Sequence, residues 1–320
     1  MRAVAVQPTT WSRIEPWLLL QELPKHLANL LPFALGTVLA WHAGGGLDWA
    51  VFAVSLVAVF LLTDGTYIAN EYFDYESDCA NEQRIGGAEK VGVTTTGGTR
   101  VLVRGLIPRR HALIMAVTSF VLAVPLGLML QLRMGTGPLT IPLGALALFI
   151  GWFYTAPPIR AAYRGLGELF IAVGQGLVIF GAYYVQRGFS IDPLIVSLPW
   201  FIALPALKIV REFPDYEADR ATGKHGLVVR FGRDRMARVY AVTIALAILS
   251  FAATWTVLPS PLLALCALPM FFLGRSMLIM ARGEWRDAAR QEAAAVSGFI
   301  GMLLVPVALA AVFLLDAALR

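Results

Sequence analysis

The chain has 320 residues, of which 58% are apolar and only 15% are charged, and its net charge is +5. Soluble globular proteins contain about 45–50% apolar and about 25% charged residues, so this composition excludes a soluble domain and a disordered chain, and the presence of only two cysteines excludes a disulfide scaffold. A positive charge in so apolar a chain is typical of basic cytoplasmic loops, so we expect an all-α polytopic protein of the lipid bilayer with no nucleic-acid partner.

Residues 1–23 precede the first predicted membrane helix. They contain Trp11, Trp17 and an apolar run over 18–20, which favour a helix lying in the membrane interface on the cytoplasmic face. They lack the charged start, apolar core and small-residue cleavage site of a signal peptide. We therefore expect an interfacial segment here and no signal peptide.

Nine stretches are long and apolar enough to cross a bilayer, which takes about 20 residues of helix. They run over 24–41, 47–72, 111–132, 138–156, 165–186, 193–210, 236–258, 261–281 and 293–315. We expect residues 24–320 to form one domain of nine membrane helices.

Basic residues orient these helices. The links that follow even-numbered spans carry 19 Lys and Arg residues, whereas three, Arg133, Arg187 and Arg320, lie on the opposite side. Because cytoplasmic loops carry an excess of Lys and Arg, the N-terminus and the even-numbered links are predicted to be cytoplasmic and the C-terminus external. We expect the membrane to be a prokaryotic cytoplasmic membrane.

Acidic residues are scarce, 21 in total, and eight of them fall in two windows, 71–78 and 212–219. Aligned without gaps, the windows share Glu, Asp, Tyr, Glu and Asp at five of eight positions. They end the second and sixth spans, four helices apart. This predicts an internal repeat over 24–137 and 138–258, followed by the later helices.

Aspartates four residues apart within each window suggest the chemistry. Asp74 and Asp78, like Asp215 and Asp219, are spaced to lie one helical turn apart. Carboxylates that face one another repel unless cations lie between them, and Mg²⁺ prefers such oxygen ligands together with waters and substrate phosphates. The pattern favours a Mg²⁺ site that binds a diphosphate. The alternative is that these acids only decorate solvated helix ends.

Long basic links follow both acidic windows. Arg100 comes after two glycines and a threonine, and Lys224 directly follows Gly223. Glycines let the backbone approach an anion closely, and a cation beside a diphosphate neutralises the charge of the leaving group. We expect Arg100 and Lys224 to bind phosphates, whereas most other basic residues only follow the cytoplasmic excess of positive charge.

Together these residues resemble the UbiA superfamily of intramembrane prenyltransferases. The resemblance rests on the motifs Asn70, Asp74 and Asp78, and Asp215 and Asp219, with weaker matches at 23–25, 98–106, 154–158 and 223–232. It implies a ring of nine helices around a central cavity that is capped on the cytoplasmic side. It also implies transfer of a polyprenyl group from a polyprenyl diphosphate to an acceptor that is usually aromatic.

The resemblance implies roles for residues at the helix ends. The four aspartates would bind Mg²⁺ and, with Asn70, the diphosphate, while Arg100 and Lys224 would hold the phosphates. Arg160, in the basic link after the fourth span, is expected to be a further diphosphate contact.

Other candidates lie deeper in the predicted helices. Departure of the diphosphate leaves an allylic cation, which Tyr67, Tyr72 and Tyr154 would stabilise with their ring faces, unless these tyrosines only form an interfacial belt. A lone charge inside a membrane helix costs at least about 2.5–3.5 kcal/mol. We therefore hypothesise that Asp64 and Lys208 face the cavity and act in catalysis, either paired with each other or in contact with the acceptor. The alternative is a buried ion pair that only fixes helix packing.

Residues 163–168 and 181–186 resemble the menaquinone branch of the superfamily, whose members prenylate 1,4-dihydroxy-2-naphthoate. That branch commonly has Asn-Asp where this chain has Asn70-Glu71, and paired asparagines where it has Arg211-Glu212. We expect an aromatic acceptor such as 1,4-dihydroxy-2-naphthoate and a role in quinone biosynthesis. The alternatives are prenyl transfer to a non-aromatic lipid, cyclisation of the prenyl substrate, or a cation-coupled transporter.

Overall fold

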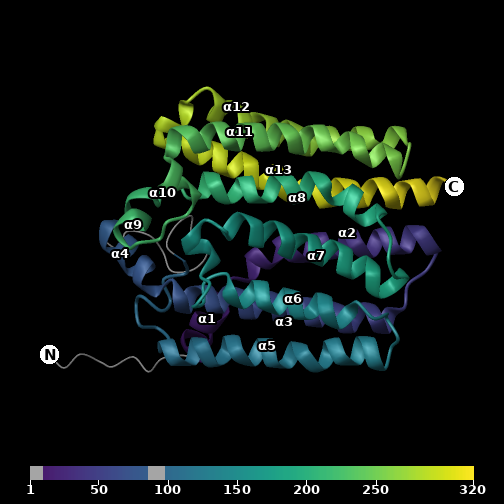
Figure 1. Ribbon diagram of the computed structural model, residues 1–320, viewed down its shortest axis with the longest axis horizontal. Helices are drawn as coiled ribbons and strands as arrows, with labels where there is room; N and C mark the ends of the chain where they lie inside the picture. Colours follow the sequence, from purple (N-terminus) through teal and green to yellow (C-terminus); the bar gives the residue numbers. More distant parts are fainter. Residues whose placement is uncertain (1–9, 86–97) are drawn as a thin grey trace.

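The computed structural model describes residues 10–85 and 98–320, and these residues form helices and connecting turns without a β-strand. Long helices lie side by side in one bundle (Figure 1). The short helices α4 (Tyr75–Ile85), α9 (Tyr216–Ala221) and α10 (Leu227–Phe231) gather at one end, called the cap end below, and the C-terminus lies at the other.

Eight helical segments of the described residues are long and apolar enough to cross a membrane. One of them, Ile14–Gly44, includes the later part of α1 (Thr10–Leu20) and all of α2 (Leu27–Gly44), and another, Arg233–Thr256, contains α11 (Arg233–Ser250). The eight are Ile14–Gly44, α3 (Trp49–Phe73), α5 (Arg109–Leu132), α7 (Gly167–Arg187), α8 (Asp192–Arg211), Arg233–Thr256, Pro261–Ala281, which contains α12 (Ala267–Ala281), and α13 (Ala288–Leu319). Each overlaps a predicted span, so the polytopic all-α fold is confirmed.

Short 3-10 helices complete the described chain. They are η1 (Leu23–His26), η2 (Ala161–Arg164), η3 (Phe251–Thr256), η4 (Pro261–Cys266) and η5 (Glu284–Arg286).

The fourth predicted span, 138–156, is shorter than expected. It forms α6 (Thr140–Phe153), which is apolar but has only 14 residues. At 1.5 Å per residue this helix is about 21 Å long, less than the hydrocarbon thickness of about 30 Å. Pro157 and Pro158 follow within five residues, and proline cannot continue a helix. Length and composition therefore support eight of the nine predicted spans in the described chain.

The long helices close into a ring. Each contacts the next along the chain, from α2 through α3, α5, α6, α7, α8, α11, α12 and α13, and α13 returns to contact α2. Across the ring α2 also packs on α7, where Gly36 lies so close to the Ile179 carbonyl that a Cβ would overlap it. Small residues permit such approaches in membranes, where apolar surface alone drives little helix association.

The N-terminal segment joins the ring through a sharp turn. After α1 the backbone adopts a left-handed conformation at Glu22, with φ of 51°, and η1 then leads into α2. Leu20 is fully buried against a cluster that includes Ile68 and Ala116. Residues 1–9 and the side chain of Trp11 lie outside the described part. The interfacial location of 1–23 and the repeat over 24–137 and 138–258 stay predictions.

Candidate active site

A cavity of about 1300 Å³ runs inside the ring, lined by α2, α3, α5, α6, α7, α8 and α13. Asp74, Asp78 and Asp215 line it at the cap end. Far from the cap end its wall is apolar and includes Leu128 and Val185, near the ends of α5 and α7. The cavity therefore suits a ligand with a polar head at the cap end and a long apolar tail.

Both acidic windows lie where a membrane helix gives way to a short cap-end helix. α3 is followed at once by α4, and α8 is followed after a turn by α9. In both windows the second aspartate donates its backbone N–H to the carbonyl of the first, at 2.9 Å from Asp78 to Asp74 and 2.8 Å from Asp219 to Asp215. Each pair therefore lies one turn apart, as its spacing predicts. Contacts between α4 and α9 bring the windows together.

Lys224 lies between the two windows. Its Nζ is 3.5 Å from Asp74 Oδ2 and 3.9 Å from Asp219 Oδ1, and Ser77 Oγ donates to Asp219 Oδ1 at 3.4 Å. Burial raises the pKa of Asp219, although Lys224 opposes this shift. Burial acts to lower the pKa of Lys224, but Asp74 and Asp219 outweigh it and hold that pKa well above its usual range. The lysine thus neutralises carboxylates of both windows.

The chain after residue 97 returns to the first window. Glu71 accepts hydrogen bonds from the backbone N–H and the hydroxyl of Thr99, at 2.8 and 2.6 Å. Gly98 has a φ of 63°, and a Cβ there would lie 2.8 Å from Asp78 Oδ2, so only glycine fits. Burial and the nearby Glu71 carboxylate raise the pKa of Asp78 well above its usual value. Arg100, which follows Thr99, is fully buried.

Tyr163 is a site residue that sequence reasoning missed. Its hydroxyl donates to Asp74 Oδ1 at 2.7 Å, and the Arg160 guanidinium lies 3.8 Å from the centre of its ring. Burial and the Asp74 carboxylate raise the pKa of Tyr163, so its hydroxyl stays protonated and donates. The sequence places Tyr163 in a basic link and in the stretch 163–168 that resembles the menaquinone branch, but neither signal reveals its bond to Asp74. Nearby, Asn70 Oδ1 accepts a hydrogen bond from Thr155 at 2.9 Å.

Asp64 and Lys208 do not pair with each other. Asp64 accepts a hydrogen bond from Ser119 of α5 at 2.8 Å, and it is buried on the flank of α3 that packs against α5, apart from the cavity lining found among the described residues. Lys208 does line the cavity, where it binds Glu168 Oε1 at 2.8 Å and also Glu212. Of the two predicted arrangements, the Asp64–Lys208 pair is contradicted, because each charge has a partner on its own or a neighbouring helix, while contact with the acceptor stays a prediction. Asp64 is not among the cavity-lining residues of the described chain.

The three tyrosines expected near the cation separate into two groups. Tyr67 and Tyr154 line the cavity. Tyr72 instead lies under Arg109, whose guanidinium is 5.1 Å from the centre of the Tyr72 ring. Tyr72 does not contribute to the cavity wall of the described chain. Only Tyr67 and Tyr154 are therefore placed to act on a ligand in the cavity.

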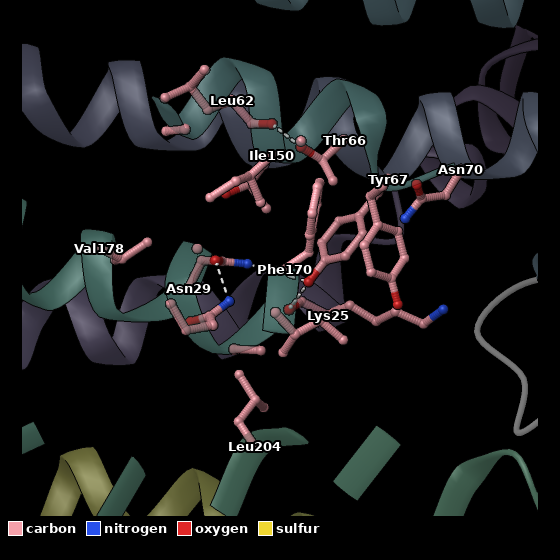
Figure 2. A pocket seen from close by; sticks show the side chains of 18 of the residues that line it. Lys25, Asn29, Leu62, Thr66, Tyr67, Asn70, Ile150, Phe170, Val178 and Leu204 are labelled. Carbon is pink, nitrogen blue, oxygen red and sulfur yellow. Dashed lines mark hydrogen bonds between the residues drawn. The ribbon is translucent and has the colours of Figure 1, made fainter. Parts of the chain in front are cut away.

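A second polar layer lies deeper in the cavity than the aspartates, and of its members Tyr67 was predicted from the sequence whereas Asn29 and Gln175 were missed. Figure 2 shows Asn29 and Tyr67 directed toward a space that Phe170, Val178 and Leu204 also border. Asn29 Nδ2 donates to the Tyr67 hydroxyl at 3.2 Å, and Gln175 Nε2 donates to Asn29 Oδ1 at 2.7 Å. A polar residue inside a membrane span is a sequence signal for function, but it does not reveal its partner.

The cap-end carboxylates fit a metal only in company with a ligand. Among the described residues, no three His, Cys, Asp or Glu side chains gather closely enough to hold an ion by themselves. Mg²⁺ usually takes one or two carboxylates and completes its shell with waters and substrate phosphates. Burial and the nearby Asp74 carboxylate raise the pKa values of Asp78 and Asp219, and a cation suits these acids because it offsets the repulsion between the carboxylates.

Comparisons with known proteins agree with this geometry. A model of the UbiA prenyltransferase family matches residues 29–303. The 2-carboxy-1,4-naphthoquinone phytyltransferase of Synechocystis is 27% identical over 86% of this chain and 85% of its own length. The 1,4-dihydroxy-2-naphthoate octaprenyltransferase of Escherichia coli is 30% identical over 72% of this chain and 73% of its own length. The solved structure of a UbiA homolog from Archaeoglobus fulgidus bound to GPP and Mg²⁺ shares the fold, with a TM-score of 0.62 at 16% identity over 92% of this chain and 99% of that chain.

Proposed function

The chain belongs to the UbiA prenyltransferase family, and we propose that it transfers a polyprenyl group from a polyprenyl diphosphate to an aromatic acceptor, with Mg²⁺ as its cofactor. We propose a dihydroxynaphthoate as the acceptor and quinone biosynthesis as the setting. The names of two relatives, a naphthoquinone phytyltransferase and a dihydroxynaphthoate octaprenyltransferase, support this choice.

One observation carries the proposal: two acidic windows from distant parts of the chain meet at the polar mouth of an apolar cavity. Lys224 contacts both windows, and Asp74, Asp78 and Asp215 line the cavity below it. A polyprenyl diphosphate has a matching division into an anionic head and an apolar tail. Transporters typically bind their substrates and ions near the middle of the membrane, whereas these acids cluster at the cap end.

We assign the diphosphate to the cap end. Asp74, Asp78, Asp215 and Asp219 would hold Mg²⁺ together with phosphate oxygens, and the bound ion would neutralise charge that grows on the leaving group. Lys224, which contacts Asp74 and Asp219, would contact phosphate oxygens with those aspartates holding Mg²⁺.

Three further residues complete this head-group site in our proposal. Arg100 and Arg160 supply positive charge, the former beside the Thr99–Glu71 contact and the latter through its stacking on Tyr163. Asn70 lines the cavity and offers its amide N–H groups, because its carbonyl oxygen already accepts a bond from Thr155. The polar groups thus surround the head on several sides.

The reaction proceeds in the cavity below the head group. The allylic C–O bond breaks, the diphosphate keeps the electron pair, and the prenyl C1 becomes a cation that the rings of Tyr154 and Tyr67 stabilise away from water. A carbon of the electron-rich acceptor ring attacks C1, and the proton that this carbon then loses passes to the released diphosphate. Lys208 lines the same cavity, and we assign it to contact with polar groups of the acceptor.

The protein is an integral membrane protein with eight segments fit to cross the bilayer in its described part. We propose that the cap end and the N-terminus face the cytoplasm of a prokaryotic cell and that the C-terminus lies outside. The excess of Lys and Arg in the links after even-numbered spans supports this orientation.

Purified full-length protein tests the function. It is incubated with Mg²⁺, labelled polyprenyl diphosphate and separate acceptors: 1,4-dihydroxy-2-naphthoate, 4-hydroxybenzoate, homogentisate and a glycerol-phosphate lipid. We expect prenyl transfer to the naphthoate, and loss of diphosphate release in Asp78→Asn and Asp219→Asn but not in Asp316→Asn, which lies near the C-terminus and pairs with Arg320. Transfer to the lipid alone favours the non-aromatic alternative. If the protein neither transfers the prenyl group nor releases diphosphate, the proposal is contradicted and a transporter is favoured.

A further inference from the structure

Three polar side chains form a hydrogen-bonded chain across the cavity below the aspartates, and they are called the amide chain here. Gln175 of α7 donates to Asn29 of α2 at 2.7 Å, and Asn29 donates to the hydroxyl of Tyr67 in α3 at 3.2 Å. Tyr67 in turn donates to the backbone carbonyl of Lys25 at 3.1 Å. Gln175, Asn29 and Tyr67 all line the cavity. Residues from three helices therefore present one connected polar surface to whatever occupies this space.

The amide chain has a direction, and its first member has an unused acceptor. Every bond runs from Gln175 toward Lys25, and the buried Oε1 of Gln175 accepts no hydrogen bond from the described residues. A buried amide oxygen without a partner costs about 1–3 kcal/mol. The missing group is thus a hydrogen-bond donor. A hydrocarbon tail has none to offer, so the prenyl chain does not satisfy this position.

The depth of the amide chain matches the position of an acceptor. Tyr67 lies seven residues before Asp74 in α3, or about 10 Å deeper along the helix axis. A diphosphate held at the aspartates leaves the prenyl C1 between these two levels. An aromatic ring that attacks C1 then has its substituents beside the amide chain, with Phe170 and Leu204 bordering the same space (Figure 2).

We propose that the amide chain recognises the acceptor, and that its ligand is a hydroxylated aromatic ring whose hydroxyl donates to Gln175 Oε1. This inference rests on the proposed function, and it identifies the acceptor hydroxyl as the group that the amide chain recognises. The hydrogen bonds from Gln175 to Asn29 and from Asn29 to Tyr67 hold Gln175 Oε1 in a fixed direction. Asn29 and Tyr67 are therefore positioning residues for Gln175.

Paired probes that differ by one hydroxyl test the inference. The full chain is reconstituted with Mg²⁺ and a thiodiphosphate analogue of farnesyl diphosphate, which fills the donor site without reacting. Calorimetry then measures the affinity of 4-hydroxy-2-naphthoate and of 2-naphthoate. We expect wild-type protein to bind the hydroxylated probe about 3- to 10-fold more tightly, the effect of one neutral hydrogen bond. Gln175→Met, which keeps the length of the side chain, should abolish this preference.

Gln186→Met is the matched control, because Gln186 lies on the same helix but bonds the backbone of Asp48 outside the cavity. It should keep the wild-type preference for the hydroxylated probe. The inference is overturned if wild-type protein binds both probes equally or binds neither, or if Gln175→Met retains the preference and only lowers the melting temperature. That last result would show that the amide chain only stabilises the packing of α2, α3 and α7.

The two proposals fail in different ways. Release of diphosphate from labelled polyprenyl diphosphate reports the cap end and does not depend on Gln175. If wild-type protein releases diphosphate but shows no preference for the hydroxylated probe, only the amide chain as an acceptor site is overturned, whereas absence of diphosphate release in wild-type protein overturns the proposed function.

Discussion

Charged side chains at the cap end depend on one another for their charge state. Asp74 accepts from Tyr163 and lies 3.5 Å from Lys224, which also approaches Asp219. Asp78 is buried beside Glu71 and has a raised pKa. Changing one of these residues therefore alters the others, and the consequences differ with the kind of contact removed.

Removing the hydroxyl of Tyr163 should remove a hydrogen bond from Asp74 in the first acidic window and lower activity without disturbing packing. Tyr163→Phe keeps the ring under Arg160 but loses the 2.7 Å bond to Asp74. Hydrogen bonds to charged groups contribute about 1.5–3 kcal/mol, so we expect kcat/KM for the polyprenyl diphosphate to fall at least about 10-fold. Steady-state release of diphosphate measures this. Tyr183→Phe, in the apolar core, should change little, and equal losses in both variants would contradict the assignment.

Binding of Mg²⁺ should strengthen as the pH rises. Burial raises the pKa of Asp78 and Asp219, so both keep their protons to a higher pH than an ordinary aspartate, and a metal binds only the deprotonated form. A raised folded pKa also means that the metal-free fold loses stability as these groups ionise. We expect Mg²⁺ to raise the melting temperature more at pH 8 than at pH 6. A larger or equal rise at pH 6 would show that these carboxyls do not control binding.

The sequence predicted these residues unevenly, for a physical reason. Spacing along one helix is visible in a single chain, so the aspartate pairs were found from residues four apart. The partners of Tyr163 and Gln175 lie 89 and 146 residues away, and only the folded ring brings them together. Lys208 was identified from the sequence as a charged residue in a membrane helix, but its ion pairs with Glu168 and Glu212 were not predicted.

Helices and links set the positions that these side chains occupy. The first window depends on the link that returns through Gly98, because Thr99 ties it to Glu71 and Gly98 approaches Asp78. Hydropathy located the long apolar helices, since each overlaps a predicted span. It overestimated α6, because 138–156 is apolar throughout and the prolines after the helix decide where it ends.

A methyl group at Gly98 should disrupt the first window. In Gly98→Ala the Cβ would lie 2.5 Å from Glu71 Oε1 and 2.8 Å from Asp78 Oδ2, in addition to backbone strain of about 1–2 kcal/mol. Gly105→Ala carries similar strain, with a φ of 68°, but has no atom within 4 Å of the added Cβ. We expect both variants to lose stability and only Gly98→Ala to lose most of its diphosphate release. Similar activities in the two variants would show that the return link does not shape the site.

At the scale of the whole molecule, the ring encloses one cavity that runs from a polar end to an apolar one. Its aspartates lie at the cap end, and Val185 lines it near the far end of α7. The predicted orientation of the chain in the membrane therefore decides from which side the diphosphate enters.

Labelling from one side of the membrane checks this orientation. Cysteines are introduced as Phe189→Cys, at an exposed position after α7, and Arg235→Cys, at an exposed position at the start of α11, with Cys79 and Cys266 replaced by serine. We expect a membrane-impermeant maleimide added to intact cells to label position 189 and not position 235. In permeabilised cells both positions should be labelled. Labelling of position 235 and not of position 189 in intact cells would place the cap end outside.

Closure of the ring by its last helix affects how the protein is made. α13 contacts α2, the first helix of the ring, and contributes Ala295, Phe299 and Met302 to the cavity wall. The other ring helices precede α13 in the chain, so during synthesis they leave the ribosome before this part of the cavity wall exists. The cavity can therefore close only after α13 has been made, and a product that stops before α13 lacks this part of the wall.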